Sequence, residues 1–463
     1  MQRIPLSTLL IVTLAGATTL AAVPPSAARD IRDFGAKPDG KTLCTDAIQS
    51  AVDQCAKKGG GTVYCPPGTW LTGTVYLDSN ITIYLDSGCT ILGTKEKARY
   101  GPKRSLPNGE TFSYWGIFAG KGLKHVAIRG PGAIDGRGAN FKYKNGPRPK
   151  NIYFEDCSDV LIEGVRLRNA GSWMQHYRNC DRLTIRNIAV FNHVSYNNDG
   201  LNIDSCRDVV ITGCSIDSDD DAIVLKSLST KPCENVIISD CIVSSHCNSI
   251  KMGTESGGGF RNITVTNCTI CSPRYSKVIY GRQRGLAGIA LEIVDGGTLQ
   301  RVAVSNITIK GVTVPIFMRL GDRARIYGED GQKPGAGKFR NVTVSNIIAT
   351  DCSSTGCSIT GLPGHDIENV TFSNINLTFD GGGTKADASR DIPEKPASYP
   401  ESTMFGTLPS YGFFCRHVKG LEFHNVRLQT STADQRCAIV FDDVQDASID
   451  SLIAPFATDA SPI

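Results

Sequence analysis

"CRDVVITGCSI", residues 206–216, is one of five similar segments that together decide the fold. The others are "CSDVLIEGVRL" (157–167), "CDRLTIRNIAV" (180–190), "CENVIISDCIV" (233–243) and "FRNITVTNCTI" (260–270). In chain order the copies start 23, 26, 27 and 27 residues apart, and weaker copies begin at residues 300, 339, 367 and 421. Each contains an alternation of β-branched residues, a polar turn and a second strand.

A unit of this length cannot bury its own apolar face, but stacked copies can, because each inward residue contacts its counterpart one coil away. The repeat therefore predicts an all-β fold, a single-stranded right-handed parallel β-helix. Turn asparagines should form side-chain ladders and adopt left-handed backbone geometry. The clearest of these are Asn187, Asn267, Asn306, Asn346 and Asn374.

The chain has 17 cysteines, and most of them follow the repeat. Cys214, Cys241 and Cys268 recur at steps of 27 residues, which predicts a stack of small buried side chains. Two groups outside the regular columns are predicted as disulfide candidates: Cys44, Cys55 and Cys65, and the pair Cys352 and Cys357. No cysteine–histidine spacing typical of a metal site is present, and the sequence predicts neither a metal nor another cofactor.

The N-terminal segment 1–28 is predicted to be a signal peptide, with Arg3 before an apolar run and small residues at 21–22 and 27–28. The run is too short to span a membrane, so we expect a secreted or periplasmic protein without membrane contact. Residues 29–463 are then expected to form a single β-helix domain, acting as a monomer. A net charge of +4, spread evenly, does not favour nucleic-acid binding.

The stretch "TDAIQSAVDQCAKKGGG" (45–61) interrupts the β pattern near the N-terminus. Ala47, Ile48, Ala51, Val52 and Cys55 form one helical stripe, and three glycines end it. A solenoid must cover its open end, so this stretch predicts a short capping helix.

Four aspartates crowd the segment "DSDDDAIVLKS" (217–227), which alone is either a solvated turn or a set of carboxylates held at one spot. The strands "DGLNIDS" (199–205), "DAIVLKS" (221–227), "NSIKMGT" (248–254) and "GIALEIV" (288–294) align on their alternating apolar residues. The alignment matches Leu201, Ile223, Ile250 and Ile289 as inward residues, and likewise Ile203, Leu225, Met252 and Leu291. The residues between them point outward: Asn202, Asp204, Val224, Lys226, Lys251 and Glu292.

Adjacent coils lie about 4.8 Å apart. We therefore expect Asp199 within a few ångströms of Asp220 and Asp221, with His246 one coil further on. Carboxylates this close repel one another, so at least one pKa should rise. An acid held protonated beside ionised neighbours is what a glycosidase requires.

The run "NNDG" (197–200), the Asp220–Asp221 pair and the histidine of "SHCNSI" (245–250) resemble the signature of glycoside hydrolase family 28, whose members degrade pectin. The opening "DFGAKPDGKTLCTDAIQSAVDQC" (33–55) and "GGGTVYCPPGTWLTG" (59–73) resemble that family's N-terminal pattern. The resemblance covers nearly the whole chain after residue 28. It implies hydrolysis of a pectic polysaccharide with inversion and without a metal. It assigns Asp220 as general acid and Asp199 and Asp221 as the groups that activate water, with His246 tuning or orienting them.

The sequence departs from the family pattern where a polygalacturonase binds the sugar carboxylate. The usual "RIK" strand is "ALE" here, with Ala290 and Glu292 in place of the two cations, and the usual "GHG" is "SHC". A carboxylate there would repel galacturonate, so cations should come from elsewhere. Alternatively, the subsite takes a neutral sugar such as rhamnose, or the cleft is closed by inserted loops and acts on chain ends. The candidate substrate-binding residues are Asn197, Lys226, Lys251, Arg282, Arg284, Glu292 and Arg319.

Residues 380–413 interrupt the repeat and are predicted to form an ordered wall of the cleft, anchored by Tyr399, Phe405 and Tyr411. Two other functions remain open. A polysaccharide lyase on this fold would use a basic residue and bound calcium. A β-helix that only binds carbohydrate would need none of the aspartates for chemistry.

Overall fold

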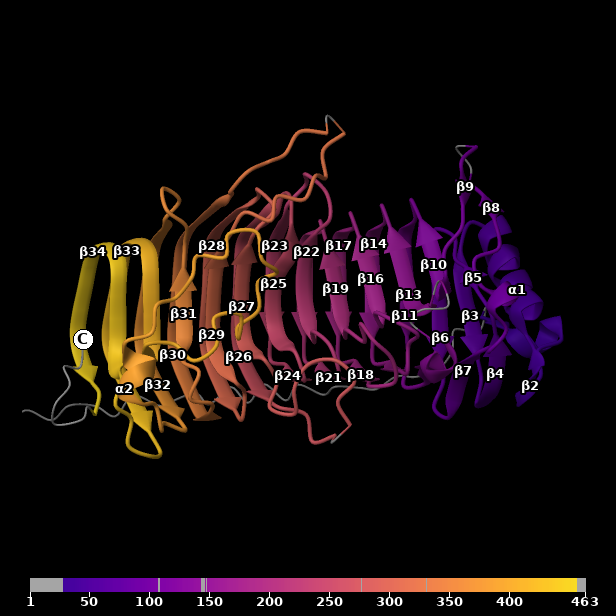
Figure 1. Ribbon diagram of the computed structural model, residues 1–463. Coiled ribbons are helices and arrows are strands. Elements are labelled where there is room, and N and C mark those ends of the chain that lie inside the picture. Colours follow the sequence, from indigo (N-terminus) through magenta and orange to yellow (C-terminus); the bar gives the residue numbers. More distant parts are fainter. Residues whose placement is uncertain are drawn as a thin grey trace, which may run out of the picture.

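The computed structural model describes residues 28–106, 109–142, 146, 148–275, 277–329 and 331–455. The predicted signal peptide, apart from residue 28, lies outside the described residues. One sheet of 32 strands winds along the molecule as a parallel β-helix, as the repeat predicts (Figure 1). Its strands form three ladders, each coil contributing one strand or strand segment to each ladder.

Ladder 1 contains β5 (Val75–Tyr76), β10 (Gly116–Lys121), β13 (Lys150–Glu155), β16 (Gln175–Arg178), β19 (Leu201–Asp204), β22 (Ile223–Ser227), β25 (Asn248–Ser256), β27 (Ala287–Ile293), β29 (Val314–Leu320) and β31 (Cys357–Thr360). It continues into the first parts of β33 (Ser410–Thr430) and β34 (Cys437–Ile453).

Ladder 2 contains β1 (Arg29–Asp30), β3 (Gly61–Cys65), β6 (Ile81–Leu85), β11 (Lys124–Arg129), β14 (Ser158–Glu163), β17 (Asp181–Arg186), β20 (Arg207–Thr212), β23 (Cys233–Ser239), β26 (Gly259–Cys271), β28 (Thr298–Lys310), β30 (Lys338–Cys352) and β32 (Ile367–Phe379). Ladder 3 contains β2 (Asp39–Leu43), β4 (Gly68–Thr72), β7 (Cys89–Gly93), β12 (Ala133–Asp135), β15 (Arg166–Arg168), β18 (Ala189–Asn192), β21 (Ser215–Ser218) and β24 (Ile242–Ser245), and then the second halves of β26, β28, β30 and β32.

The remaining elements are small. A hairpin of β8 (Arg104–Ser105) and β9 (Thr111–Phe112) stands apart from the sheet, and three 3₁₀ turns cover Ile31–Phe34, Lys97–Arg99 and Gly138–Asn140. The α-helices are α1 (Thr45–Lys57) and α2 (Lys385–Ala388). Among the described residues, no helix is long and apolar enough to cross a membrane.

The predicted capping helix is α1, which covers the N-terminal end of the solenoid (Figure 1). Ile48, Ala51, Val52 and Cys55 are buried against the first coils, and the stripe ends at glycines with positive φ. The apolar spacing thus predicted both the helix and the face that it buries.

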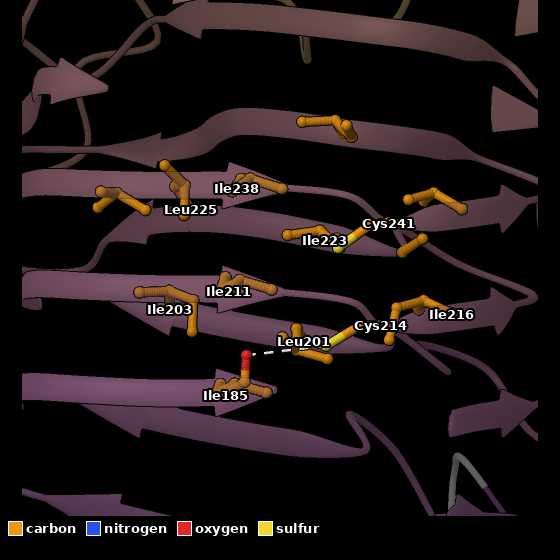
Figure 2. Close-up of a cluster of buried hydrophobic side chains, with 14 of the residues drawn as sticks. Ile185, Leu201, Ile203, Ile211, Cys214, Ile216, Ile223, Leu225, Ile238 and Cys241 are labelled. Carbon is orange, nitrogen blue, oxygen red and sulfur yellow. Dashed lines mark hydrogen bonds between the residues drawn. The ribbon is translucent and has the colours of Figure 1, made fainter. Parts of the chain in front are cut away.

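The core is a stack of side chains in register from coil to coil (Figure 2). Leu201 lies opposite Ile223 and Ile203 opposite Leu225, and the same columns continue through β25 and β27, as predicted. Cys214 is buried, and its thiol donates to the Ile185 carbonyl at 3.8 Å. Each fully buried aliphatic side chain in such a stack contributes about 1.5–3 kcal/mol.

The predicted disulfides are absent. All 17 cysteines lie in the described part of the chain, and each is a free thiol. Cys65, Cys352 and Cys357 are completely buried, and Cys44 and Cys55 nearly so. These positions belong to the packed interior like the regular columns, so the prediction of bridges outside those columns was wrong.

Asparagine ladders run along the turns, as predicted. The five named asparagines have φ between 54° and 56°. Asn306 donates to the side chain of Asn267 at 3.3 Å, Asn346 to that of Asn306 at 2.9 Å, and Asn374 to that of Asn346 at 3.0 Å. Each ladder fixes the register of successive coils by pairing like amides.

Residues 380–413 form an ordered segment that crosses the outer side of β29, β27 and β25 (Figure 1). Phe405 and Tyr411 are buried and anchor it, as predicted, but Tyr399 is 49% exposed. Tyr399 instead turns its hydroxyl toward Lys251, which donates to it at 3.4 Å. The predicted outward positions beneath leave the core but are not solvated, since Lys251 and Glu292 are 1% and 0% exposed.

Candidate active site

The turns before β19 and β22 bring Asp199, Asp220 and Asp221 together. Asp199 and Asp221 occupy the same position on adjacent, directly paired coils. The backbone N–H of Gly200 donates to the Asp221 carbonyl at 2.9 Å, and that of Asp220 donates to the Asn198 carbonyl at 3.4 Å. The three aspartates are 2%, 8% and 4% exposed in chain order, so they form one largely desolvated acidic cluster.

The three acids have different partners. Asp221 accepts hydrogen bonds from the Asn248 side chain at 2.7 Å and from its backbone at 3.3 Å, and its second oxygen lies 3.3 Å from Lys251 Nζ. Asp220 accepts from the Asp221 backbone N–H at 2.9 Å and from Asn197 at 3.5 Å. Asp221 is thus the member whose negative charge is balanced directly by a cation.

Protonation is favoured at the other two acids. Burial, followed by the charge of Asp221, raises the pKa of Asp220 to about 6. Burial and then the charge of Asp220 raise the pKa of Asp199 well above its usual value, and Asp199 Oδ1 is buried without a hydrogen-bond partner. The cluster therefore holds a proton next to an ion-paired carboxylate under mildly acidic conditions.

The raised pKa of Asp199 predicts a stability effect of Asp199→Asn. A carboxyl group whose pKa rises on folding favours the folded state at low pH, and its ionisation weakens that state as pH rises. Asn keeps the shape without the charge, so we expect the variant to melt at a higher temperature than wild type at about pH 8 and at a similar temperature at about pH 4. Calorimetry at both pH values measures this, and an equal or lower melting temperature at the higher pH would contradict it.

The other two aspartates of the 217–227 segment, Asp217 and Asp219, have partners outside the acidic cluster. Asp217 lies 2.9 Å from His193 Nε2. Asp219 is completely buried, and its two oxygens accept the backbone N–H groups of Ile279 and Tyr280 at 2.8 Å each. The solvated-turn interpretation is therefore wrong for this stretch, because Asp219 to Asp221 all lie inside the protein.

His246 lies near the cluster but faces away from it. Its Nδ1 is 3.0 Å from the Arg282 carbonyl, and its ring centroid lies 5.3 Å from that of His193. Within the described residues it makes no hydrogen bond to the three acids. Its neighbour Ser245 does, since the Ser245 hydroxyl donates to the Asp220 carbonyl at 2.7 Å.

Lys251 does not stand free in a groove. Its ammonium lies between Asp221 and Glu292, at 3.3 Å and 3.8 Å, beneath the ring of Tyr399. Burial raises the pKa of Glu292 to about 8, against the lowering effect of Lys251. Both side chains predicted to meet substrate are thus sealed below the 380–413 segment, and they pair with each other.

The predicted arginines are spread out. Arg284 pairs with Asp380 at the start of the inserted segment. Arg319 is 1% exposed and donates to the carbonyls of Gly361 and Glu394 at 3.1 Å and 2.7 Å, so it holds the insert in place. Arg282 is exposed, and its backbone carbonyl lies at hydrogen-bond distance from His246. The structure therefore does not gather these arginines around the acids.

Lys226 keeps its predicted place on β22 but is largely buried. Its ammonium lies 3.1 Å from Glu255 and 5.0 Å from the centre of the Trp173 ring. Asn197, predicted to bind substrate, lies beside the acidic cluster: it donates to Asp220, and its carbonyl oxygen accepts from Arg148 at 3.0 Å.

Sequence reasoning missed a second cation, Lys150. In the register of β13, β16 and β19, Trp173 holds the position of Asp199 one coil earlier, and Lys150 holds it two coils earlier. Lys150 Nζ lies 4.6 Å from the centre of the Trp173 ring, and burial lowers its pKa to about 7. A pocket of about 260 Å³ opens here, lined by Arg148, Lys150, Ser172, Trp173 and Asn197. Extending the strand alignment two coils toward the N-terminus would have found both residues.

The inserted segment also contributes an acid that the repeat could not predict. Burial raises the pKa of Glu401 to about 7, and its charge acts on Asp221 and Lys251. Because residues 380–413 lie outside the repeat, no register argument places this side chain.

Comparison with known proteins agrees with this architecture. The sequence model of glycosyl hydrolases family 28 matches residues 78–398. The chain belongs to glycosyl hydrolases family 28. Residues 28–100 also match the family described as "Rhamnogalacturonase A/epimerase, pectate lyase-like".

Two curated relatives align with part of this family 28 chain. A probable polygalacturonase of Vitis vinifera is 32% identical over 212 residues, which are 42% of this chain and 43% of the relative. An exo-poly-alpha-D-galacturonosidase of Dickeya chrysanthemi is 33% identical over 170 residues, which are 33% of this chain and 27% of the relative. The matched region thus spans less than half of either relative's length.

Among solved structures, an exopolygalacturonase from Thermotoga maritima superposes with a TM-score of 0.67 at 22% identity. The superposition covers 89% of this chain and 93% of that structure. This likeness concerns the fold alone, and the chemistry of this family 28 chain depends on the residues of its own site.

Proposed function

We propose that this protein is a secreted or periplasmic glycoside hydrolase that cleaves pectic polysaccharide, galacturonan or rhamnogalacturonan, by single displacement with inversion. The observation that carries the proposal is the buried acidic cluster, with Asp220 and Asp199 inclined to hold protons beside the ion-paired Asp221. Family membership and the polygalacturonase relatives support the reaction class.

The roles follow from the surroundings of each acid. Asp220, with its pKa raised to about 6 and Asn197 at its carboxyl group, protonates the glycosidic oxygen as the bond breaks. Asp221, balanced by Lys251, is the carboxylate that accepts a proton from the attacking water, and Asp199 shares this role only in its ionised form. His246 acts as a positioning residue, because its contact is with the Arg282 backbone.

The pocket beside Asn197 is proposed as the subsite for an acidic sugar. Lys150 and Arg148 provide positive charge there, and the Trp173 ring offers an apolar face for a sugar. It takes the place of the missing "RIK" cations, since Lys251 is already paired with Asp221 and Glu292.

This subsite predicts the effect of Lys150→Gln. Loss of a charge-assisted contact to a carboxylate costs about 1.5–3 kcal/mol, so KM for an oligogalacturonide should rise roughly tenfold or more. KM for a neutral oligosaccharide should change little. Steady-state kinetics on both substrates measure the difference, with the exposed Lys124→Gln as control. Equal changes on the acidic and neutral substrates would remove Lys150 from carboxylate binding.

The reaction itself is tested with a panel of galacturonan and rhamnogalacturonan oligosaccharides. Product analysis should show saturated sugars, and proton NMR of early products should show the anomer opposite to that of the substrate. A lyase is the second candidate, because Lys150, with its pKa lowered to about 7, could serve as the base beside the sugar carboxylate. Unsaturated products absorbing in the ultraviolet would establish the lyase instead.

A further inference from the structure

Three buried side chains occupy the same position on three successive coils next to the acidic cluster. His193, Asp219 and His246 each follow directly after a ladder 3 strand, β18, β21 or β24, whose last residues are paired in register. They are 1%, 0% and 0% exposed. One oxygen or nitrogen ligand atom from each lies within 4.8 Å of the others.

In both His193 and His246, one ring nitrogen is hydrogen-bonded to a group outside this cluster, which leaves the other nitrogen with a lone pair directed into it. His246 Nδ1 lies 3.0 Å from a backbone carbonyl, which can only accept, so Nδ1 carries the hydrogen and Nε2 is left unprotonated. His193 Nε2 lies 2.9 Å from Asp217, a carboxylate acceptor, which leaves Nδ1 unprotonated. His193 Nδ1 and His246 Nε2 are both buried without a hydrogen-bond partner.

These unpartnered nitrogens need an explanation, because a buried polar atom without a partner costs about 1–3 kcal/mol. Asp219 does not satisfy His193, since its nearer oxygen is 4.0 Å away from Nδ1 and accepts from the Ile279 backbone. A group that binds lone pairs, placed between the three residues, would satisfy both nitrogens and the carboxylate at once.

We propose that His193, Asp219 and His246 bind a divalent transition-metal ion, for which Zn²⁺ is the best match. Two imidazoles and one carboxylate are a ligand set that zinc takes at about 2.0–2.2 Å, with a fourth position left for water. Each ligand atom needs to close in by roughly 1 Å or less to reach those bond lengths. Imidazole ligands disfavour Ca²⁺ and Mg²⁺, which prefer oxygen.

The surroundings match those of histidine-containing metal sites in proteins. A histidine ligand typically donates its other N–H to a carboxylate or backbone carbonyl, as His193 does to Asp217 and His246 to Arg282. The rings of Phe191 and Tyr275 lie 4.8 Å and 5.1 Å from that of His193. The site is closed and lies apart from the carboxyl groups of the proposed reaction, so it does not depend on the hydrolase assignment.

The ion would tie the loop between β26 and β27 to the solenoid. Asp219 holds the backbone of Ile279 and Tyr280, and His246 holds that of Arg282, so three points of this loop depend on two of the ligands. Tyr280 adjoins the acidic cluster, where burial and the charge of Asp220 raise its pKa. The metal would therefore fix one wall of the candidate active site from behind.

Metal binding is tested on the full chain. Protein stripped with a chelator and then dialysed against ZnCl₂ should retain one zinc per chain by elemental analysis, and zinc should raise its melting temperature. Competition with a chromophoric chelator gives the affinity. Asp217→Asn removes a partner of a ligand and should weaken the zinc affinity by roughly 10–100-fold. His193→Gln and Asp219→Asn remove ligands themselves and should weaken the zinc affinity by more than that. His125→Asn, at an exposed position of β11, is the control and should bind like wild type.

Circular dichroism verifies that each variant is folded. If a variant does not fold, the test is instead made on the wild-type protein loaded with cobalt. Its visible spectrum should then show the intense absorption of a four-coordinate site. Absence of stoichiometric zinc in wild type would overturn the proposal. So would equal zinc affinity in wild type and a folded His193→Gln variant, or a cobalt spectrum typical of a six-coordinate, water-rich site.

Discussion

Asp220→Asn should lower kcat by roughly 10²–10⁴-fold while leaving the protein folded, because a general acid contributes about that factor. Asn keeps the shape of the side chain and its contact with Asn197 but has no proton to give to the leaving oxygen. The wild-type rate should fall as pH rises above about 6, since the active form carries the proton whose pKa burial raises to about that value. Initial rates on a pectic oligosaccharide across pH measure both effects.

A substrate with a more acidic leaving group separates this role from a structural one. An aryl glycoside needs less protonation, so Asp220→Asn should lose far less activity on it than on an oligosaccharide. A merely structural change would affect both substrates equally. Asp208→Asn, at an exposed position of β20 in the same coil, is the matched control and should keep full activity. Near-complete activity of Asp220→Asn on the oligosaccharide would remove Asp220 from the reaction.

The Lys251→Met substitution should lower the free energy of unfolding by about 3–5 kcal/mol. Lys251 is completely buried between Asp221 and Glu292, so its removal leaves Asp221 without the cation that balances it. The cost should be smallest at low pH, where carboxyl groups become neutral by protonation. Denaturant titration at about pH 5 and pH 8 measures the change, with the exposed Lys231→Met as control.

A second substitution checks the cause. Lys251→Met combined with Glu292→Gln removes one of the two acids that face the lost ammonium, and should recover part of the stability. If the double variant is as unstable as the single one, or if Lys251→Met costs less than about 1 kcal/mol, the ion cluster does not carry this stability. A rise in KM for acidic substrates without any loss of stability would instead return Lys251 to the substrate-binding role first inferred from the sequence.

The register of the coils was predictable because a strand has a strict two-residue period. Matching Leu201 to Ile223 was enough to place Asp199 beside Asp221, and the structure has that pairing. The same argument stops where the repeat stops. That Lys251 is covered by Tyr399, and Arg319 fixed by Glu394, depends on contacts with residues some 75 to 148 positions away.

Two other failures have a different physical origin. The cysteines at positions 352 and 357 were predicted to form a bridge because they lie outside the regular columns, but both are interior residues of the solenoid. Lys150 escaped notice because its strand precedes the first clear copy of the repeat, although the register would have placed it. The two-residue period of the strands predicts where a residue lies on its coil. Which side chains are covered, and which charges pair, depends on segments outside the repeat.

The coil length varies along the solenoid, although each strand stays paired in parallel with its counterpart one coil away. The chain needs 23 residues to pass from Val160 to its partner Leu183, and 51 to pass from Val370 to Leu421. The long connections, 272–286, 321–337 and 380–409, all enter or leave ladder 1, which carries the acids. Replacing these loops should therefore change what the protein recognises, while the paired strands beneath them stay the same.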